Sequence, residues 1–549
     1  MSINKIDKKN SKHLLMTLLS ISALLFIAIN LLWEHYNFNF SYMCMGSDNF
    51  NSIIDLFINL QHDIGFLKDS LYLSYGHSSY PSLYFLIHSL TGLILGRINH
   101  MTVVTVNSVI VLISALFSYK ISSVLKNRSA GCISFIILTL YPATYGISRY
   151  PMLETLILAL VPLIIYLIIK SQNFSNTKYS ILLGLSLCLG LLTKYHFLIF
   201  VVPGIIYELF KLIINWNKNS TSTNKTKCLN IALIIFIALA PAIGYYVKNY
   251  KEIIRYLLMS YSRKGLIGGE TIPSGSLNSW FFYLFTLINY QLSLPFFLVF
   301  ISGTINLIFR KKIDQNFTHL WLAILIPYLF LQTGDVKWAR YSIGYIPICA
   351  IISAIFISGL KKGLRNTTIS VLFLFGITQN ISSSFLEIKQ KPLLKTKLFK
   401  DRDYYDAKGN IYPLLYNYEV RPPDYNNKII FQSIIEQIKI YSTDKLIIDM
   451  FIRESKSHQL CSEISAYLKI YADKHSLKYR LIFTAKDIEQ IIMDAKSFKE
   501  SISVFRIMPE EESRLYSLSD NIEREEVLKL RLTSTDSKNL ITHLLLWKK

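Results

Sequence analysis

Long apolar runs recur along the first 385 residues of the chain. The first covers 14–33, follows lysines at 5, 8, 9 and 12, and ends without the small residues of a signal-peptide cleavage site. We therefore expect a retained helix with a cytoplasmic N-terminus. About 20 apolar residues cross roughly 30 Å of hydrocarbon as a helix. Ten further spans are predicted at roughly 101–119, 130–147, 153–170, 179–195, 197–215, 229–247, 290–309, 318–332, 341–359 and 368–384.

The apolar run at 80–96 is short for a span and contains His88. If it crossed the membrane, every later loop would change sides, and the Lys and Arg of the loops would lose their cytoplasmic excess. The positive-inside rule therefore favours an interfacial or re-entrant helix at 80–96. With the remaining runs as spans, about 11 transmembrane helices leave the C-terminus outside.

The composition changes after Phe385. Residues 386–424 carry four prolines among tyrosines and charges, which predicts a connector along the membrane surface. In 425–549, amphipathic stretches alternate with short runs such as KLIIDMF and SISVFRI, which predicts a small extracytoplasmic α/β domain with a largely parallel sheet. The predicted organisation is a membrane domain at 1–385, with its first outer loop at 34–100, followed by the connector and this domain.

Composition supports a polytopic α-helical membrane protein and excludes other classes. The 549 residues are 52% hydrophobic and only 17% charged, which is too apolar for a soluble protein. Much of the net charge of +22 lies in short loops, where it sets orientation, so nucleic-acid binding is a poor explanation for it. The six cysteines form no CxxC pair and indicate neither a disulfide framework nor a zinc site.

Isolated cations at the predicted outer helix ends are candidates for ligand binding. Lys194 lies between two apolar runs, and Lys337 and Arg340 precede another span on the same side. A charge at the bilayer centre costs roughly 3 kcal/mol, so these side chains are expected either to meet an anion or to extend to the aqueous interface. Arginine can hold a phosphate through two parallel hydrogen bonds. The Gly-rich outer loop at 248–279 would suit a mobile cover for an anionic site.

Acidic residues near the outer face are candidates for proton transfer. In the loop 36–84, Asp48 either activates a hydroxyl or caps the helix that begins there. Arg149 and Glu154 flank a span junction, where they form a local surface ion pair or contribute to a site. The many tyrosines and phenylalanines near helix ends are assigned to the aromatic belt of a membrane protein.

The order of these motifs resembles the membrane glycosyltransferases of the GT-C superfamily. Within it, the nearest likeness is to protein O-mannosyltransferases and the aminoarabinose transferases of lipid A. The resemblance covers roughly residues 14–360 and depends on the order of the motifs, since none is specific alone. It consists of the first-loop acid Asp48, YPSLYFL at 80–86, SRYPMLE at 148–154, GLLTKYHFLIFVVPG at 190–204 and KWARYSIGYIPICA at 337–350.

The resemblance implies a base and a set of phosphate ligands. Asp48 corresponds to the proposed base of the family. The phosphate of a polyprenyl-phosphate sugar would be bound by Lys194, Arg340, Lys337 and Arg149.

Three departures from the family pattern concern the supporting residues. Asn49 follows Asp48 where the family has an acidic pair, and Glu154 stands where the family commonly has Asp. Tyr80-Pro81-Ser82 lacks the basic residue of the family motif, which His77 could replace. Glu154 and His77 are therefore expected to support the site or to bind a metal, and the use of a divalent metal is left open.

The expected function is transfer of a sugar, with inversion, from a polyprenyl-phosphate carrier to a glycan, lipid or protein hydroxyl. The reaction would occur at the outer face of a bacterial cytoplasmic membrane. No cofactor is implied with certainty, and no nucleic-acid partner. Two alternatives are a transporter or flippase for a lipid-linked or anionic solute, and an inactive GT-C-like scaffold. Charges placed mid-membrane and two related halves would favour the transporter.

Overall fold

The computed structural model describes most of the first 385 residues and five strands of the C-terminal region. The described ranges are 3–37, 47–74, 80–216, 221–261, 270–271, 274–309, 315–334, 336–337, 339–385, 445–450, 478–482, 502–509, 526–533 and 539–547. The chain divides into two compact units, one formed by Met1–Glu34, Leu67–Thr91 and Asn99–Val420, the other by His35–Phe66, Gly92–Ile98 and Arg421–Lys549. The predicted connector at 386–424 lies outside the described residues, so the predicted domain boundaries stay predictions.

Helices dominate the described part of the chain, and several begin at an asparagine cap. The side chains of Asn99, Asn127 and Asn176 each accept a hydrogen bond from a backbone N–H three residues later, which satisfies a donor that the helix itself leaves unpaired. The helices are α1 (Ile3–Asn37), α2 (Ser47–His62), α3 (Phe66–Ser70), α4 (Leu83–Leu95), α5 (His100–Leu125), α6 (Arg128–Leu140), α7 (Pro142–Ser148), α8 (Glu154–Ser171), α9 (Thr177–Leu191), α10 (Leu198–Ile214), α11 (Thr221–Tyr261), α12 (Leu277–Thr286), α13 (Leu294–Ile308), α14 (Gln315–Leu331), α15 (Ile346–Ser358) and α16 (Lys362–Phe385).

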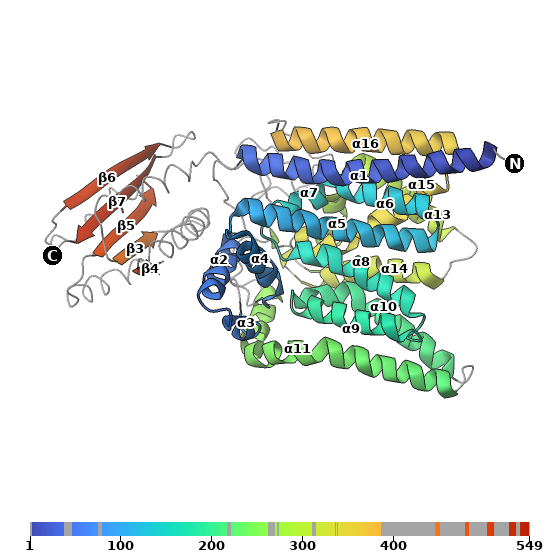
Figure 1. The fold of residues 1–549 in the computed structure, drawn as a ribbon, viewed down its shortest axis with the longest axis horizontal. Coiled ribbons are helices and arrows are strands. Elements are labelled where there is room, and N and C mark those ends of the chain that lie inside the picture. Colours follow the sequence, from blue (N-terminus) through green and yellow to red (C-terminus); the bar gives the residue numbers. More distant parts are fainter. Residues whose placement is uncertain are drawn as a thin grey trace. The chain divides into compact units, whose positions relative to one another are not determined.

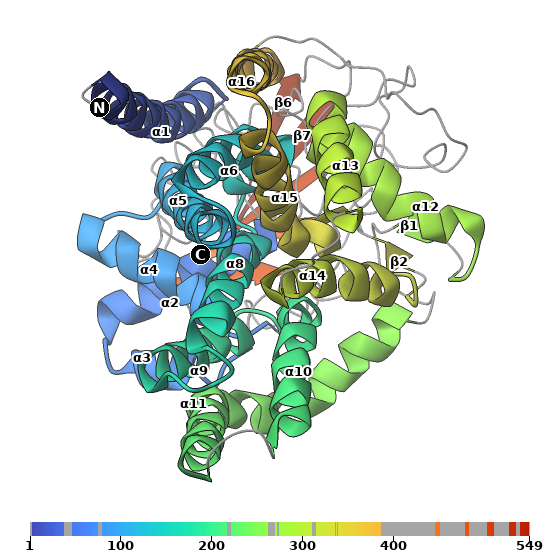
Figure 2. The same ribbon diagram turned by 90° about the vertical axis from the view of Figure 1, so that its right-hand side faces the viewer.

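The long helices of the first unit lie along a common axis, and α15 lies among them. Figure 1 shows α1, α5, α8, α9, α11 and α16 running along a common axis. α15 packs against α5, α6, α8 and α13, and Figure 2 shows these helices around it. The buried share of the apolar window is 89% for 339–358 and 78% for 154–171, but 28% for 224–255. The core therefore follows α8 and α15, while α11 turns much of its apolar surface outward.

The predicted spans coincide with helices of unequal length. Among the described residues, seven helices are long and apolar enough to cross a membrane, and nine if each of two bent pairs counts as one. The run expected as one straight span at 130–147 is divided at Tyr141-Pro142, where α6 and α7 meet at 59°. Proline causes this break because it cannot donate the helical hydrogen bond. The exact number of crossings stays a prediction.

Helix α4 occupies the run whose crossing was in question. Its 13 residues form a helix about 20 Å long, which is shorter than the roughly 30 Å hydrocarbon core. Its last residues lie beside α2 within the second unit, where Phe57 and Ile98 pack against Gly92. The helix is thus shorter than the hydrocarbon core, and the interfacial or re-entrant placement of this segment stays a prediction.

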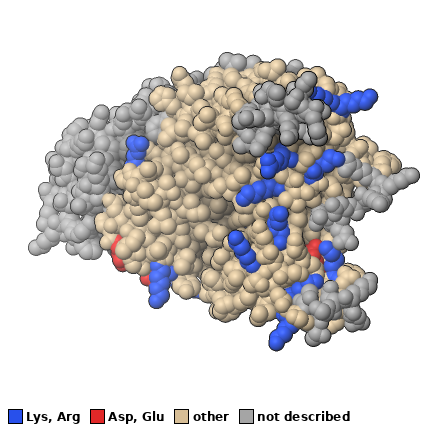
Figure 3. Space-filling view, turned by 45° about the vertical axis from the view of Figure 1, so that its right-hand side comes forward, with Lys and Arg blue, Asp and Glu red and all other residues tan. Residues whose placement is uncertain are grey.

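Basic residues gather at one end of the helices, which we call the basic end. It comprises the C-terminal ends of α5, α8, α10 and α15 and the N-terminal ends of α6, α9, α11 and α16. Figure 3 shows the Lys and Arg side chains over this surface. Its exposed cations include Lys126, Arg128, Lys178, Lys225, Lys361 and Lys362.

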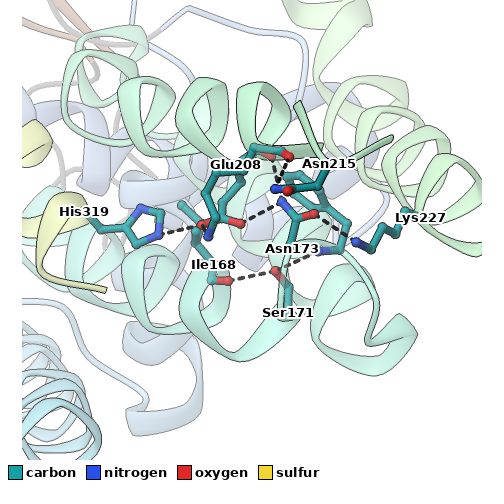
Figure 4. Close-up of polar contacts among 9 residues, drawn as sticks. Ile168, Ser171, Asn173, Glu208, Asn215, Lys227 and His319 are labelled. Atoms are coloured by element: carbon teal, nitrogen blue, oxygen red, sulfur yellow. Dashed lines mark hydrogen bonds and ion pairs between the residues drawn. The ribbon is translucent and has the colours of Figure 1, made fainter. Parts of the chain in front are cut away.

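The acidic side chain described at the basic end is Glu208, and it is buried. Its Oε1 lies 2.9 Å from His319 Nε2 and accepts a hydrogen bond of 3.0 Å from Lys211 Nζ, while Asn173 Nδ2 donates to Oε2 at 2.8 Å. Lys227 Nζ donates to Asn173 Oδ1 at 3.1 Å, and Figure 4 shows this chain of contacts. Asn173 lies in a turn whose three residues 172–174 all have positive φ, which asparagine tolerates better than most residues. Glu208 therefore joins α10, α14 and the α8–α9 turn, and Lys227 extends the contact to α11.

Five strands form one sheet in the C-terminal region. They are β3 (Lys445–Met450), β4 (Lys478–Ile482), β5 (Ile502–Pro509), β6 (Glu526–Thr533) and β7 (Asn539–Trp547), in the order β4-β3-β5-β7-β6. β3 pairs in parallel with β4 and β5, and β7 pairs antiparallel with β5 and β6. Four strands thus share one direction and β7 is reversed. The helices expected between the strands lie outside the described residues, so the α/β domain stays a prediction.

Candidate functional site

Three charged side chains from separate helix ends meet at the end opposite the basic end. Glu154 is the first residue of α8, Lys194 follows α9, and Arg340 lies in the 3-10 turn Ala339–Tyr345 (η4) that precedes α15. The Lys194 Nζ donates to Glu154 Oε1 at 2.8 Å, and Arg340 Nε lies 3.3 Å from the same oxygen. Glu154 and Lys194 are buried, and Arg340 is 12% exposed. We call these residues the charged cluster.

Local structure explains how the cluster forms. A carboxylate is favoured in the first turn of a helix, where the positive end of the macrodipole lies, and this is the position of Glu154 in α8. Lys194 has extended backbone between α9 and the short 3-10 turn Tyr195–Phe197 (η1), so the chain is not helical at the lysine. The predicted interruption of the apolar runs at Lys194 is therefore a real helix boundary.

Aromatic rings surround the two cations. The Nζ of Lys194 lies 4.7 Å from the ring centroid of Tyr80 and 5.4 Å from that of Tyr341. Arg340 Cζ lies 5.9 Å from the Tyr341 ring. His196 Nε2 donates to the backbone oxygen of Tyr341 at 2.9 Å. The negative faces of the rings stabilise the cations in a place that water reaches poorly.

The charged cluster joins two cations to one described carboxylate. One carboxylate, Glu154, faces two cations, Lys194 and Arg340, and all three are largely buried. The guanidinium and the ammonium both suit phosphate oxygens. The arrangement can therefore bind and stabilise a phosphate.

Arg149 belongs to a second buried group at the same end of the helices. Its Nε donates to Asn30 Oδ1 at 3.0 Å, and its Nη2 donates to Asn380 Oδ1 at 2.9 Å and to Ser384 Oγ at 2.7 Å. Its Cζ lies 5.0 Å from each of the rings of Trp33 and Tyr145. These contacts join α7 to α1 and α16. Arg149 is thus fully buried, and Glu154 contacts Lys194 and Arg340, so the local surface ion pair considered for Arg149 and Glu154 does not describe this structure.

Lys337 lies three residues before Arg340 and is buried. It belongs to β2 (Val336–Lys337), which pairs with β1 (Glu270–Thr271), and its backbone lies opposite Glu270. Its Nζ donates to the carbonyl oxygen of Leu331 and lies 5.9 Å from the Tyr283 ring. The two strands connect the predicted outer loop 248–279 to the segment that carries the cluster.

Two predicted site residues lie where the structure does not describe their side chains. Asp48 is the second residue of α2, and only its backbone is described. His77 lies outside the described residues. Their roles stay predictions. Among the side chains that are described, no group of three His, Cys, Asp or Glu could hold a metal ion, and the one acid of the charged cluster is occupied by two cations.

The role of the tyrosines of the site was not predicted from the sequence. Tyr80 and Tyr341 lie within the motifs YPSLYFL and KWARYSIGYIPICA, but tyrosines near helix ends were assigned to the aromatic belt. Their position inside the motifs was the signal that could have identified them. Glu208 was also missed, because its partner His319 is 111 residues away in the chain.

Comparison with known proteins gave one family match and several similar structures. Residues 79–245 match the family model described as dolichyl-phosphate-mannose-protein mannosyltransferase. No curated protein matched the sequence. The crystal structure of ArnT from Cupriavidus metallidurans in the apo state is similar with a TM-score of 0.60 and 10% identity, over 95% of this chain and 97% of that chain. ArnT from the same organism bound to undecaprenyl phosphate gives a TM-score of 0.55, at 10% identity and the same coverage.

The matched segment 79–245 contains Tyr80, Glu154 and Lys194, three residues of the site. At 10% identity the structural likeness concerns the fold, which extends over nearly the whole chain. The sequence motifs predicted the GT-C superfamily, and that prediction is confirmed. The family match over 79–245 and the fold shared with ArnT both indicate the GT-C glycosyltransferase superfamily, whose members are membrane proteins.

Proposed function

We propose that the chain is an inverting glycosyltransferase that moves a sugar from a polyprenyl-phosphate carrier to a hydroxyl acceptor. The observation that carries the proposal is the charged cluster, in which Lys194 and Arg340 converge on Glu154 at the end of the helices opposite the basic end. ArnT of C. metallidurans, which has the same fold, has been crystallised with undecaprenyl phosphate. A lipid phosphate is the kind of anion that such a buried cluster would accept.

In this reaction the bond between the anomeric carbon and the carrier phosphate breaks. Negative charge then develops on the leaving phosphate, and Lys194 and Arg340 stabilise it. Glu154 holds both cations in place before the donor arrives, so their positions need little rearrangement during the reaction. Lys337 and Arg149 stabilise the surrounding segments and add positive potential.

The acceptor hydroxyl forms the new bond to the anomeric carbon, and Asp48 takes its proton. The hydroxyl attacks from the face opposite the phosphate, so the configuration at the anomeric carbon inverts. One base is enough for this direct displacement, because a phosphate leaves without protonation. The acceptor is a glycan, a lipid or a protein.

We assign the basic end to the cytoplasm and the charged cluster to the outer face of a bacterial cytoplasmic membrane. The support is the positive-inside rule, applied to the exposed cations Lys126, Arg128, Lys178 and Lys225. The charges of the candidate site lie at helix ends, whereas a transporter would be expected to place them mid-membrane. A transporter is therefore the less favoured function.

Transfer from radiolabelled polyprenyl-phosphate sugars in membranes tests the proposal. The parent should transfer label to an acceptor, while Lys194→Met and Asp48→Asn should lower transfer at least roughly a hundredfold, as expected when a charge-stabilising group or a general base is removed. Equal transfer by the parent and Asp48→Asn would remove the base assignment. No transfer by the parent from any donor tried would favour an inactive scaffold.

A further inference from the structure

The chain passes from α12 to α13 through two irregular backbone features. Leu287–Gln291 form a π-helical turn (η3), closed by a hydrogen bond of 2.9 Å from the Leu292 N–H to the carbonyl oxygen of Leu287. Ser293 then has φ 66° and ψ 161°, a combination that is found almost only in glycine. π-turns and strained residues of this kind occur preferentially at functional sites.

The π-turn places the buried side chain of Gln291 against η4. Gln291 Nε2 donates to the carbonyl oxygen of Ala339 at 2.9 Å and to Ser342 Oγ at 2.7 Å. Ser342 Oγ itself donates to the Ala339 oxygen at 2.8 Å. The amide nitrogen thus joins both ends of the first turn of η4, and Arg340 and Tyr341 lie between the two contacts.

The orientation of the Gln291 amide follows from its partners. The Ala339 oxygen can only accept, and the Ser342 hydroxyl already donates, so both need a donor from Gln291. The other amide atom, Oε1, is buried and has no hydrogen-bond partner among the described residues. A methionine or leucine would fill a similar volume without burying that oxygen. The presence of a glutamine is therefore explained by the contacts of its nitrogen.

η4 is held from other sides as well, which leaves its first turn little freedom. His196 donates to the Tyr341 oxygen at 2.9 Å. A Cβ atom at Gly344 would lie 2.7 Å from the Phe200 ring, so the backbone of η4 is in close contact with α10. Small shifts of this turn would move the Arg340 guanidinium, which lies 3.3 Å from Glu154.

We propose that Gln291 is a positioning residue of the donor-phosphate site: its amide holds the first turn of η4 so that the Arg340 guanidinium faces Glu154 and Lys194. This inference rests on the proposed function, because it takes Arg340 as a phosphate ligand. Gln291 acts through Arg340 and does not touch the phosphate.

A double-mutant cycle tests the role of Gln291. Gln291→Met is made in the parent and in an Arg340→Ala background, and binding of a polyprenyl monophosphate is measured together with donor KM and kcat. In the parent we expect binding to weaken roughly three- to tenfold, the equivalent of about one hydrogen bond, with donor KM rising more than kcat falls. In the Arg340→Ala background Gln291→Met should change binding less than about twofold.

A matched control and a milder variant separate positioning from a general loss of structure. Gln379 is also buried beside the same turn, where its Oε1 accepts a hydrogen bond of 3.1 Å from Ser293 Oγ, so Gln379→Met disturbs the turn without removing a contact to η4. It should bind the lipid phosphate as the parent does. Ser342→Ala removes only one of the two acceptors and should give a smaller effect that also depends on Arg340.

Three results would overturn the proposal. One is equal weakening by Gln291→Met with and without Arg340, since the residue would then act only through overall structure. Another is that Gln291→Met and Ser342→Ala both bind the lipid phosphate as the parent does, while Arg340→Ala loses binding. That result would refute the role of Gln291 and leave the proposed function intact. Unchanged binding in Arg340→Ala alone would remove Arg340 from the phosphate site and with it the premise of both proposals.

Discussion

Replacing Glu154 with glutamine removes one charge from the cluster and keeps the shape of the side chain. Lys194 Nζ and Arg340 Nε lie 2.8 and 3.3 Å from the same carboxylate oxygen, so both cations lose their shared anion. Removing one partner of a buried ion pair destabilises a protein by about 3–5 kcal/mol. Because Arg340 is 12% exposed and can turn toward solvent, we expect the lower end of this range, about 3 kcal/mol.

Thermal unfolding of the purified protein, with and without a polyprenyl monophosphate, measures this effect. Without lipid, Glu154→Gln should unfold at a lower temperature than the parent. The lipid phosphate should raise the midpoint of Glu154→Gln more than that of the parent, because the anion replaces the charge that the substitution removed. We therefore expect the lipid to raise the unfolding midpoint more in Glu154→Gln, the less stable protein, than in the parent.

Glu208→Gln is the matched control, since it makes the same change in a buried and paired carboxylate at the basic end. Loss of the contacts with His319 and Lys211 should lower its midpoint, but the lipid should stabilise it no more than the parent. The reasoning is refuted if Glu154→Gln unfolds at the parental temperature. It is equally refuted if the lipid stabilises Glu208→Gln as strongly as Glu154→Gln.

Three further predictions concern the segment before Lys194, the turn at Asn173 and the orientation. A Cβ at Gly190 would lie 2.3 Å from the Phe197 ring, so Gly190→Ala should destabilise the protein by about 2 kcal/mol in thermal unfolding, whereas Gly363→Ala, with open space around it, should not. Asn173→Ala loses two hydrogen bonds to Glu208 and places alanine at φ 56°, which should destabilise by about 2–3 kcal/mol in the same assay. Lys225→Cys in a cysteine-free background should react with an impermeant maleimide only after the membrane is opened; labelling of intact cells would reverse the assigned orientation.

The sequence predicted the helices well because each apolar run must form a helix to satisfy its backbone in a membrane. It also predicted Lys194 as a helix boundary, since a lysine between two apolar runs is unfavourable inside a span. It did not predict the break at Tyr141-Pro142 or the π-turn before α13. The proline offered a signal for the first of these, whereas the π-turn depends on contacts between Gln291 and η4, which lie 48 residues apart or more.

The partners of the charged residues could not be predicted either, because they too are far apart in the chain. Glu154 was considered with Arg149, five positions away, but its oxygen contacts Lys194, 40 positions away, and Arg340. Helix packing determines which helix ends are neighbours, and therefore which charged residues pair. A motif can thus identify residues of a site without showing which of them share it.

The two ends of the helices differ in whether their cations are exposed or buried, and this difference is relevant to function. At the basic end the described cations are largely exposed, and the described acid, Glu208, is buried where it joins α10, α14 and the α8–α9 turn. This pattern is explained by orientation in the membrane and by stability alone. At the opposite end the cations Lys194, Lys337 and Arg149 are buried, where orientation gives no reason to place them. Burial of a cation is unfavourable unless an anion or another polar partner compensates it, and Glu154 lies within 3.3 Å of both Lys194 and Arg340. A guanidinium and an ammonium that converge at one place are the groups that bind phosphate oxygens, and this is the physical reason to expect an anionic ligand at that end.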